Sequence, residues 1–99
     1  MFYYFMEIKR EAIQLKFVID KIREIRKQKS VSQLELSVES NLSQSFLASV
    51  EKGKKQPSVL TLLRIANALD VSPRRFFPES QEISNDEKKE IIIDLIRSL

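Results

Sequence analysis

The 99-residue chain contains no cysteine and no histidine, and it has one glycine and three prolines. The absence of cysteine excludes a disulfide framework, a zinc–cysteine site and a thiol nucleophile. The absence of histidine removes the commonest general base and metal ligand in proteins. The chain also lacks a glycine-rich loop that could hold a phosphate group. We therefore expect no enzymatic activity, no metal site and no cofactor.

The scarcity of glycine and proline also indicates the fold class. Sheets often depend on glycine and proline at tight turns, whereas helices with short connections need few of them. A length of 99 residues suffices for one domain with a modest hydrophobic core. The composition therefore predicts an all-α protein.

The net charge of +3 is unevenly distributed along the chain. Residues 17–78 contain eleven Lys and Arg against six Asp and Glu, a balance of +5. Residues 79–99 contain three Lys and Arg against six Asp and Glu, a balance of −3. Residues 1–16 contain three Lys and Arg against two Asp and Glu, a balance of +1. A basic excess in the central segment favours a polyanionic partner, with a solvated basic surface as the alternative.

Residues 32–53 contain the signals of two short helices joined by a tight turn. Ser32 and Ser43 are suitable N-caps, because a serine hydroxyl accepts a hydrogen bond from a free amide of the first helical turn. Glu35 follows Ser32 by three residues, as in a capping box. Asn41 tolerates the left-handed backbone that ends a helix, and Gly53 adopts it at no steric cost. The stretch predicts a helix-turn-helix whose facing apolar residues are Leu36, Leu42, Leu47 and Val50.

An amphipathic helix is predicted before this stretch, because apolar residues recur at intervals of four and three from Glu7 onward. The stripe contains Ile8, Ala12, Leu15, Ile19 and Ile22. The pattern fits either one long helix from Glu7 to Lys29 or two helices separated by a break near Lys16.

The first six residues are largely aromatic, and such a run is costly to expose to water. They lack the basic start and the length of a secretory signal, and a membrane span needs about 20 apolar residues. We therefore expect a cytoplasmic protein without a membrane partner. The segment is expected to form a short strand, a tucked arm or an interface element.

Two further helices are predicted after Gly53. Ser58 is placed to cap a fourth helix, and Ser72 and Pro73 to begin a brief fifth one. The fourth helix is expected to supply much of the core through Leu60, Leu62, Leu63, Ile65, Ala66 and Leu69. Phe76 and Phe77 are expected to close the open end of the bundle.

A last amphipathic helix is predicted after the acidic linker at residues 79–84. Ser84 and Glu87 form a second candidate capping box at its start. Its broad apolar face consists of Ile91, Ile92, Leu95, Ile96 and Leu99. A terminal helix with such a face is expected either to fold back on its own bundle or to pair with a second copy.

Short motifs occur in a fixed order between residues 17 and 77. They are Ile22-Arg23-Glu24-Ile25-Arg26, Val31-Ser32-Gln33 with Leu36, Leu42-Ser43 with Leu47, Val50-Glu51-Lys52-Gly53-Lys54, Pro57-Ser58, Leu62-Leu63, Ile65-Ala66, Ala68-Leu69, Val71-Ser72-Pro73 and Phe76-Phe77. In this order they resemble the Cro and phage-repressor type of helix-turn-helix regulators, the xenobiotic-response-element family. The short chain also resembles the controller proteins of restriction–modification systems.

The resemblance implies a five-helix phage-repressor-like DNA-binding bundle. We assign the bundle to residues 17–78, an N-terminal extension to residues 1–16, and a linker with a C-terminal dimerisation helix to residues 79–99. The implied dimer interface consists of Ile91, Ile92, Leu95, Ile96 and Leu99, because this class reads DNA as symmetric pairs.

The resemblance also implies which residues read bases. The N-terminal residues of the second helix of the motif enter the major groove, beginning with Gln44. An amide donates and accepts at once and so matches the edge of adenine. Ser45 and Ser49 lie on the same side and are expected to reach bases directly or through water. A glutamine at the position of Gln33 binds phosphate in the family and braces the one at Gln44.

The DNA backbone is expected to be held by Gln33 and by residues at both ends of the recognition helix. Lys52, Lys54 and Lys55 follow that helix and supply positive charge for phosphates. Ser43 precedes it. Phe46 is expected on the outer rim, where it presses against a sugar or a thymine methyl group or packs on the neighbouring helix.

Arg26 and Glu51 occupy positions where the family forms a buried or half-buried structural ion pair. The chain departs from the family at Ser30 and Asn41, where glycine is usual, and at two positions that favour small apolar residues, Ser37 and Ser40. Leu34 and Val38 are surplus apolar residues on the expected outer face. We expect the N-terminal aromatic segment to cover them, in the same subunit or the next.

These observations predict a sequence-specific DNA-binding transcriptional regulator. It is expected to bind double-stranded DNA as a homodimer on a palindromic site, with half-sites about 34 Å apart or a multiple of that. No small-molecule effector site is visible in the sequence. The alternative is an antitoxin or protein-interaction module whose C-terminal helix binds a partner protein.

Overall fold

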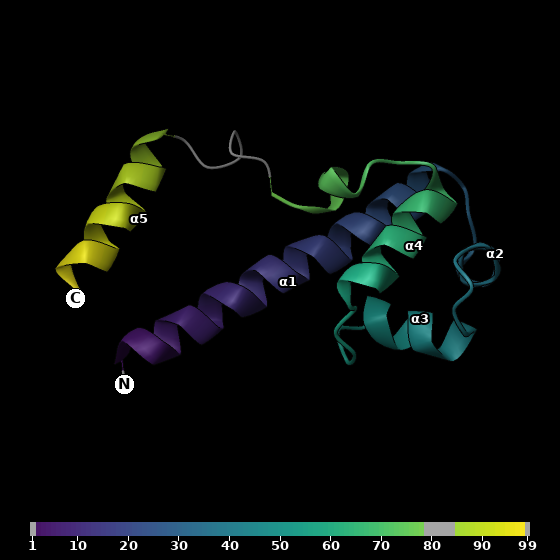
Figure 1. Ribbon diagram of the computed structural model, residues 1–99, viewed down its shortest axis with the longest axis horizontal. Helices are drawn as coiled ribbons and strands as arrows, with labels where there is room; N and C mark the ends of the chain where they lie inside the picture. The colour runs from purple at the N-terminus through teal and green to yellow at the C-terminus, as the bar shows by residue number, and fades with distance from the viewer. Residues whose placement is uncertain (1, 79–84, 99) are drawn as a thin grey trace.

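The computed structural model describes residues 2–78 and 85–98, and these residues form helices without any strand. Figure 1 shows their order along the chain. The elements are α1 (Phe2–Gln28), α2 (Gln33–Glu39), α3 (Gln44–Glu51), α4 (Val59–Leu69), the 3-10 helix η1 (Pro73–Phe76) and α5 (Asn85–Arg97). The predicted all-α fold is confirmed.

Each helix from α2 to η1 begins at a serine. The hydroxyls of Ser32, Ser43 and Ser58 accept hydrogen bonds from the amide three residues further on, at 3.0–3.1 Å. Ser72 caps η1 in a similar way, with Pro73 at its first position. These caps satisfy amides that have no partner within the helix, so they place the helix starts where the sequence predicts them.

The left-handed backbone occurs at four positions of the described chain. Gly53 has φ +77°, and three residues with side chains, Ser30, Asn41 and Asp70, have φ between 55° and 57°. Ser30 and Asn41 thus take the left-handed conformation that glycine usually supplies in the family. Asp70, which ends α4, was not anticipated from the sequence.

The core of the domain lies between α1, α2, α3, α4 and η1. Its buried members are Val18, Ile22, Ile25, Leu36, Leu47, Ile65, Ala66, Leu69 and Phe76. Ser37 and Ser40 are also buried, and their hydroxyls donate to the carbonyl oxygens of Leu34 and Leu36. Serine therefore replaces a small apolar residue at both positions without leaving a buried polar atom unpaired.

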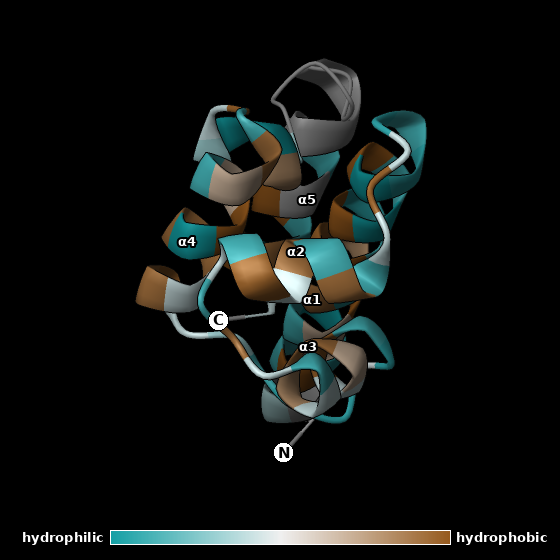
Figure 2. Cartoon of the chain, turned by 90° about the vertical axis from the view of Figure 1, so that its right-hand side faces the viewer, coloured by the Kyte–Doolittle hydropathy of each residue, from teal (hydrophilic) through white to brown (hydrophobic). Residues whose placement is uncertain are grey.

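The N-terminal part of α1 differs from two expectations. The helix is continuous from Phe2 to Gln28, so of the two predicted alternatives the single long helix is confirmed, with an earlier start than Glu7. The alternative with a break near Lys16 is wrong, and residues 2–6 form neither a short strand nor a tucked arm. No glycine or proline interrupts residues 2–28, and nothing therefore stops the helix from continuing outward. Leu34 and Val38 of α2 are exposed, so the aromatic segment does not cover them within one chain. Figure 2 faces α2, whose outward side carries hydrophobic as well as hydrophilic residues.

Three predicted core residues lie at the surface. Leu60 and Leu63 of α4 are exposed, because the buried face of that helix contains Thr61, Ile65, Ala66 and Leu69. Phe76 fills the core as predicted. Phe77 is exposed, because it follows η1 in an extended conformation that directs it out of the bundle.

The helix α5 has no extensive packing partner among the described helices. Ile92 and Ile96 are exposed and Leu95 is half-buried. Folding back of this helix on its own bundle is therefore not observed. The side chain of Ile91, residue Leu99 and the capping box at Ser84 lie outside the described residues.

No described helix is long and apolar enough to cross a membrane.

Candidate nucleic-acid interface

The second helix of the motif, α3, lies at the edge of the domain with one side anchored in the core (Figure 1). Leu47 and Val50 are fully buried and attach α3 to the other helices. Ser43, Gln44 and Ser45 at its N-terminal end are exposed. Side chains of this first turn are therefore free to reach a ligand outside the domain.

The residues predicted to read bases are not equally accessible. Gln44 and Ser45 are exposed, whereas Ser49 is half-buried one turn further along α3. The hydroxyls of Ser43 and Ser45 lie 3.5 Å apart. Gln44 and Ser45 therefore offer the most accessible hydrogen-bonding groups on this end of α3.

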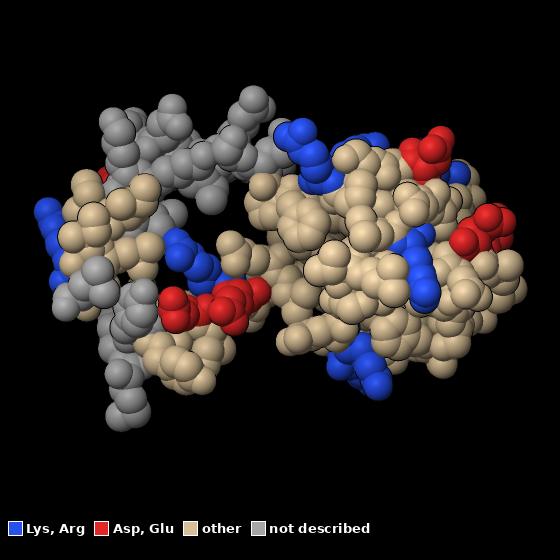
Figure 3. All heavy atoms as spheres, in the orientation of Figure 1, with Lys and Arg blue, Asp and Glu red and all other residues tan. Residues whose placement is uncertain are grey.

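Three lysines lie at the other end of α3. Lys52, Lys54 and Lys55 are all exposed. The turn that carries them is ordered by hydrogen bonds from the amides of Lys54 and Lys55 to the carbonyl oxygen of Ser49, at 2.9 and 3.2 Å. On the face seen in Figure 3, Lys and Arg side chains are scattered over the domain rather than gathered into one block.

Phe46 is half-buried, so part of its ring is covered and part remains accessible. Its amide donates to the Ser43 hydroxyl. Phe46 is therefore partly packed within the domain and partly accessible next to the exposed turn.

Gln33, at the start of α2, is directed toward the other end of α3. Its side-chain amide donates to Oε1 of Glu51 over 3.5 Å, a long and therefore weak hydrogen bond. No hydrogen bond joins Gln33 to Gln44, and the brace implied by the family resemblance is not formed here. The buried carboxylate of Glu51 attracts donors, which accounts for this direction.

Arg26 and Glu51 form a two-point ion pair between the end of α1 and the end of α3. Nε and Nη2 of Arg26 donate to the two carboxylate oxygens of Glu51 at 3.0 and 2.9 Å. The Arg26 side chain is 12% exposed and that of Glu51 4%. Arg26 also donates to the carbonyl oxygen of Val31 at 3.1 Å. The pair therefore joins α1, α3 and the loop before α2, and it fixes the orientation of α3.

A second group of charges, which sequence reasoning missed, lies on α1. Asp20 accepts hydrogen bonds from Lys16 and Arg23, both at 2.7 Å. These bonds, first that of Lys16, lower the pKa of Asp20 below its ordinary value, while partial burial opposes the shift. The spacings of four and three residues along a helix were the available signal.

An open groove of about 390 Å³ runs beside these charges. It is lined by residues of α1 and by Glu51, Lys52 and Gly53 at the end of α3. The groove lies between the middle of α1 and the turn after α3 that begins at Lys52. Of its charged residues, Asp20 is paired with Lys16 and Arg23 along α1, and Glu51 is paired with Arg26. Among the described residues, no group of three or more Asp and Glu is placed to hold a metal ion.

Comparison with known proteins agrees with this geometry. A family model described as "Helix-turn-helix" matches residues 22–76. An uncharacterised HTH-type transcriptional regulator, y4dJ of Sinorhizobium fredii, is 39% identical over 57 residues, which cover 58% of this chain and 74% of that protein. The immunity repressor protein of Bacillus phage phi105 is 33% identical over 67 residues, which cover 68% of this chain and 46% of the repressor.

A solved structure has the same fold. The restriction–modification controller protein C.AhdI from Aeromonas hydrophila is 36% identical and has a TM-score of 0.61, and the match covers 64% of this chain and 96% of that protein. The predicted resemblances to phage repressors and to controller proteins are both confirmed. The chain therefore belongs to the helix-turn-helix family of DNA-binding transcriptional regulators, and it is a regulator rather than an enzyme.

Proposed function

We propose that this regulator binds a palindromic operator as a homodimer, with α3 of each copy in the major groove of one half-site. The observation that carries the proposal is the exposed first turn of α3, which bears Gln44 and Ser45 on a helix anchored by buried Leu47 and Val50. Two copies related by a twofold axis would place their recognition helices about 34 Å apart or at a multiple of that spacing.

The base contacts follow from side-chain chemistry. Gln44 is the residue that discriminates, because its amide pairs with adenine at two points and contributes about 1–3 kcal/mol of preference. Ser45 has a short hydroxyl that reaches bases directly or through water. Ser49 is half-buried one turn further along the same side of the helix, where it contributes through water.

Contacts to the DNA backbone position this helix. Ser43 and Phe46 flank the base-reading turn, and Ser43 is exposed whereas Phe46 is half-buried. Lys52, Lys54 and Lys55 bind phosphates after α3. Gln33 exchanges its weak bond to Glu51 for a phosphate oxygen, at small cost because that bond is 3.5 Å long.

The homodimer relies on the apolar face of α5, on which Ile92 and Ile96 are exposed and Leu95 is half-buried. The apolar spacing of the sequence assigns Ile91 and Leu99 to the same interface. The similarity to an immunity repressor and to a restriction–modification controller protein supports the control of transcription as the role of the complex.

Selection from random DNA duplexes tests this proposal. The wild type is expected to enrich an inverted repeat, bound by two copies of the chain. Gln44→Ala is expected to lose preference at one base position in each half-site. Lys54→Ala is expected to weaken binding to all duplexes alike and to reduce the slope of log K against log salt by about 0.9 for each lost phosphate contact.

Gln14→Ala is the matched control, since it removes an exposed glutamine from α1. It is expected to leave the selected sequence unchanged. The enrichment of no sequence would contradict specific recognition, and one copy per inverted repeat would contradict the homodimer. A monomer that co-purifies with an unrelated chain would instead favour the interaction module.

A further inference from the structure

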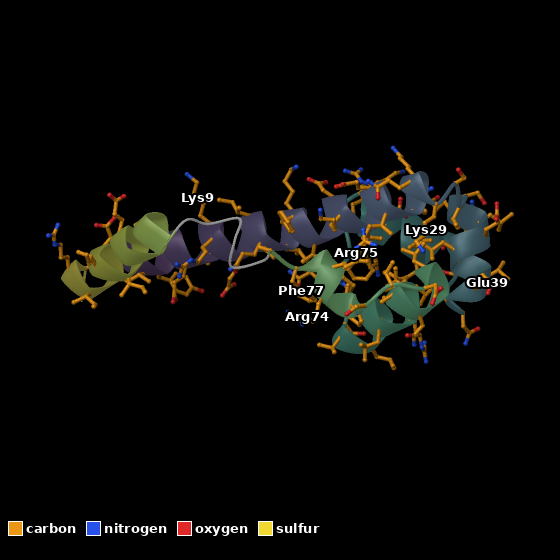
Figure 4. The ribbon with its side chains drawn as sticks, turned by 90° about the horizontal axis from the view of Figure 1, so that it is seen from above. Lys9, Lys29, Glu39, Arg74, Arg75 and Phe77 are labelled. Carbon is orange, nitrogen blue, oxygen red and sulfur yellow. The ribbon has the colours of Figure 1, made fainter. Side chains whose placement is uncertain are left out.

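One side of α1 carries a row of basic residues at intervals of seven. Lys9, Lys16 and Arg23 lie within about 40° of one another around the helix, because seven residues nearly complete two turns. In Figure 4, Lys9 projects from one side of α1 and Phe77 lies on the opposite side. Asp20 lies beside this row, and the other acidic residues of α1 lie at least about 60° away from it. The row therefore forms a distinct basic side of the helix.

Two members of this row border the open groove between α1 and the end of α3. Lys16 and Arg23 line one side of this groove of about 390 Å³, and Lys52 lines it from the end of α3. The Lys16 side chain is 76% exposed and that of Arg23 43%. Three cationic residues from two elements thus border one accessible space.

The groove keeps an excess of positive charge after its ion pairs are counted. Asp20 is the single carboxylate that pairs with the two cations of α1. Glu51 pairs with Arg26 and adds no net charge. Two cations on α1, one carboxylate and Lys52 therefore give a balance of +2. An ammonium has three donors and a guanidinium five, so one bond from each to Asp20 leaves further donors for an anionic ligand.

The DNA backbone is the anion that the recognition helix brings to this groove. The major groove of DNA is about 12 Å wide and a helix with its side chains about 10–12 Å across, so a backbone runs along each side of the bound helix. Lys52 and Gly53 line the groove, and Lys54 and Lys55, the proposed phosphate contacts, follow directly in the chain. This continuity favours DNA over a small anion or an acidic protein, which α3 would not bring to the groove.

We propose that the groove binds the DNA backbone, and that Lys16 and Arg23 are phosphate contacts contributed by α1. This inference rests on the proposed function and adds the basic side of α1 to the DNA interface. Asp20 offsets part of the positive charge and weakens the attraction for phosphate. The footprint of each copy then extends from the major groove across the adjacent backbone to α1.

The salt dependence of DNA binding tests the proposal. Fluorescence anisotropy measures the affinity for the selected operator and for a duplex of random sequence. Lys16→Ala and Arg23→Ala are each expected to reduce the slope of log K against log salt by about 0.9 for each copy bound. At about 0.1 M salt, this change corresponds to roughly eightfold weaker binding per copy. Lys16→Arg and Arg23→Lys keep the charge and are expected to retain most of the affinity.

Arg10→Ala is the matched control. Arg10 is an exposed cation of the same helix, but it lies about 120° around α1 from Lys16. Its removal is expected to leave the slope close to that of the wild type. An equal reduction by Arg10→Ala and Lys16→Ala would mean that only the total charge matters, and the inference would be wrong.

Asp20→Asn distinguishes a DNA contact from a structural role of the two cations. This change removes both ion pairs of α1 but no positive charge. It is expected to bind DNA at least as tightly as the wild type, without a smaller salt slope. If Asp20→Asn weakened binding as much as Lys16→Ala does, the cations would act by ordering α1, which would overturn the inference. Far-ultraviolet circular dichroism of each variant identifies any unfolding.

Hydroxyl-radical footprinting locates the contact on the DNA. The wild type is expected to protect backbone positions that Lys16→Ala/Arg23→Ala leaves exposed, next to those that depend on Lys54. Identical protection by the wild type and the double variant would overturn the inference.

Failure of this inference can be separated from failure of the proposed function. If Gln44→Ala relaxes base preference while the double variant keeps the wild-type slope and footprint, α1 is not part of the interface and the proposed function stands. A wild type that binds neither the random duplex nor any selected sequence would overturn both.

Discussion

The two halves of α1 provide a comparison within a single helix. The half in the domain packs against η1, α3 and α4. The other half, residues 2–16, is called the arm; it continues the same helix and the same apolar stripe, but Tyr4 and Ile8 on that stripe are exposed. Ile22 is therefore buried and Ile8 half exposed, although both are isoleucines on one face of one helix. Local sequence does not distinguish them.

The difference shows what fixes the conformation of this protein. In water, most helix stability in proteins comes from packing of an amphipathic face rather than from intrinsic propensity. In the domain, that packing joins residues far apart in the chain, as Arg26 and Glu51 do. Substitutions in the domain should therefore change its stability strongly, and substitutions in the arm should change it little.

The largest effect on stability is expected from Glu51→Leu. This change leaves Arg26 charged, nearly buried and without its carboxylate partner. Removal of one partner from a buried pair costs about 3–5 kcal/mol, whereas replacement of both by apolar side chains is often neutral or stabilising. We therefore expect Arg26→Met/Glu51→Leu to unfold at a higher temperature than Glu51→Leu. Additive effects in a thermal double-mutant cycle would show that the two residues are not coupled.

A matched pair of substitutions on α1 sharpens the comparison directly. Ile22→Ala removes a fully buried side chain and should lower the free energy of unfolding by about 2–5 kcal/mol, because it leaves a cavity. Ile13→Ala removes an exposed side chain from the arm and should change it by less than about 0.5 kcal/mol. Urea denaturation measures both. Similar losses would mean that the arm is packed as tightly as the domain.

Features set by local chemistry were predictable from the sequence. A serine cap depends on residues within one turn, so Ser32, Ser43 and Ser58 were identified correctly as helix starts. The left-handed ends at Asn41 and Gly53 also follow from single residues. The bounds of α3 follow from these signals together with the apolar spacing.

Features set by distant partners were less predictable. Leu60 and Leu63 have the same apolar character as Ile65, and only the position of α4 in the bundle decides which of them is buried. The arm is a similar case, since its stripe predicts burial without specifying a partner. Exposed Leu34 and Val38 show that an apolar pair on one helix does not identify the segment that would cover it.

The same distinction applies within the candidate interface. The exposure of Gln44 and Ser45 was anticipated from their position in the first turn of α3. The direction of Gln33 toward Glu51 depends on where the end of α3 meets the start of α2, and helical spacing does not contain that information.

The smallest effect on stability is expected from substitution of Asp20, which lies near the boundary between the arm and the domain. Lys16 and Arg23 hold its pKa below the ordinary value. A lowered pKa in the folded state means that the carboxylate stabilises the fold above about pH 4, and this contribution is lost as the pH falls through the folded-state pKa. Because all three side chains are substantially exposed, solvent screens the pairs and their contribution is small.

Asp20→Asn should therefore lower the melting temperature at pH 7 by only about 1–3 °C. The difference from wild type should shrink as the pH falls below 4 and vanish near pH 2, where both chains lack the charge. Thermal melts across this range, with Asp94→Asn on α5 as the control, measure it. A constant difference at every pH would show that Asp20 acts through packing, and the boundary would then belong to the tightly packed half of α1.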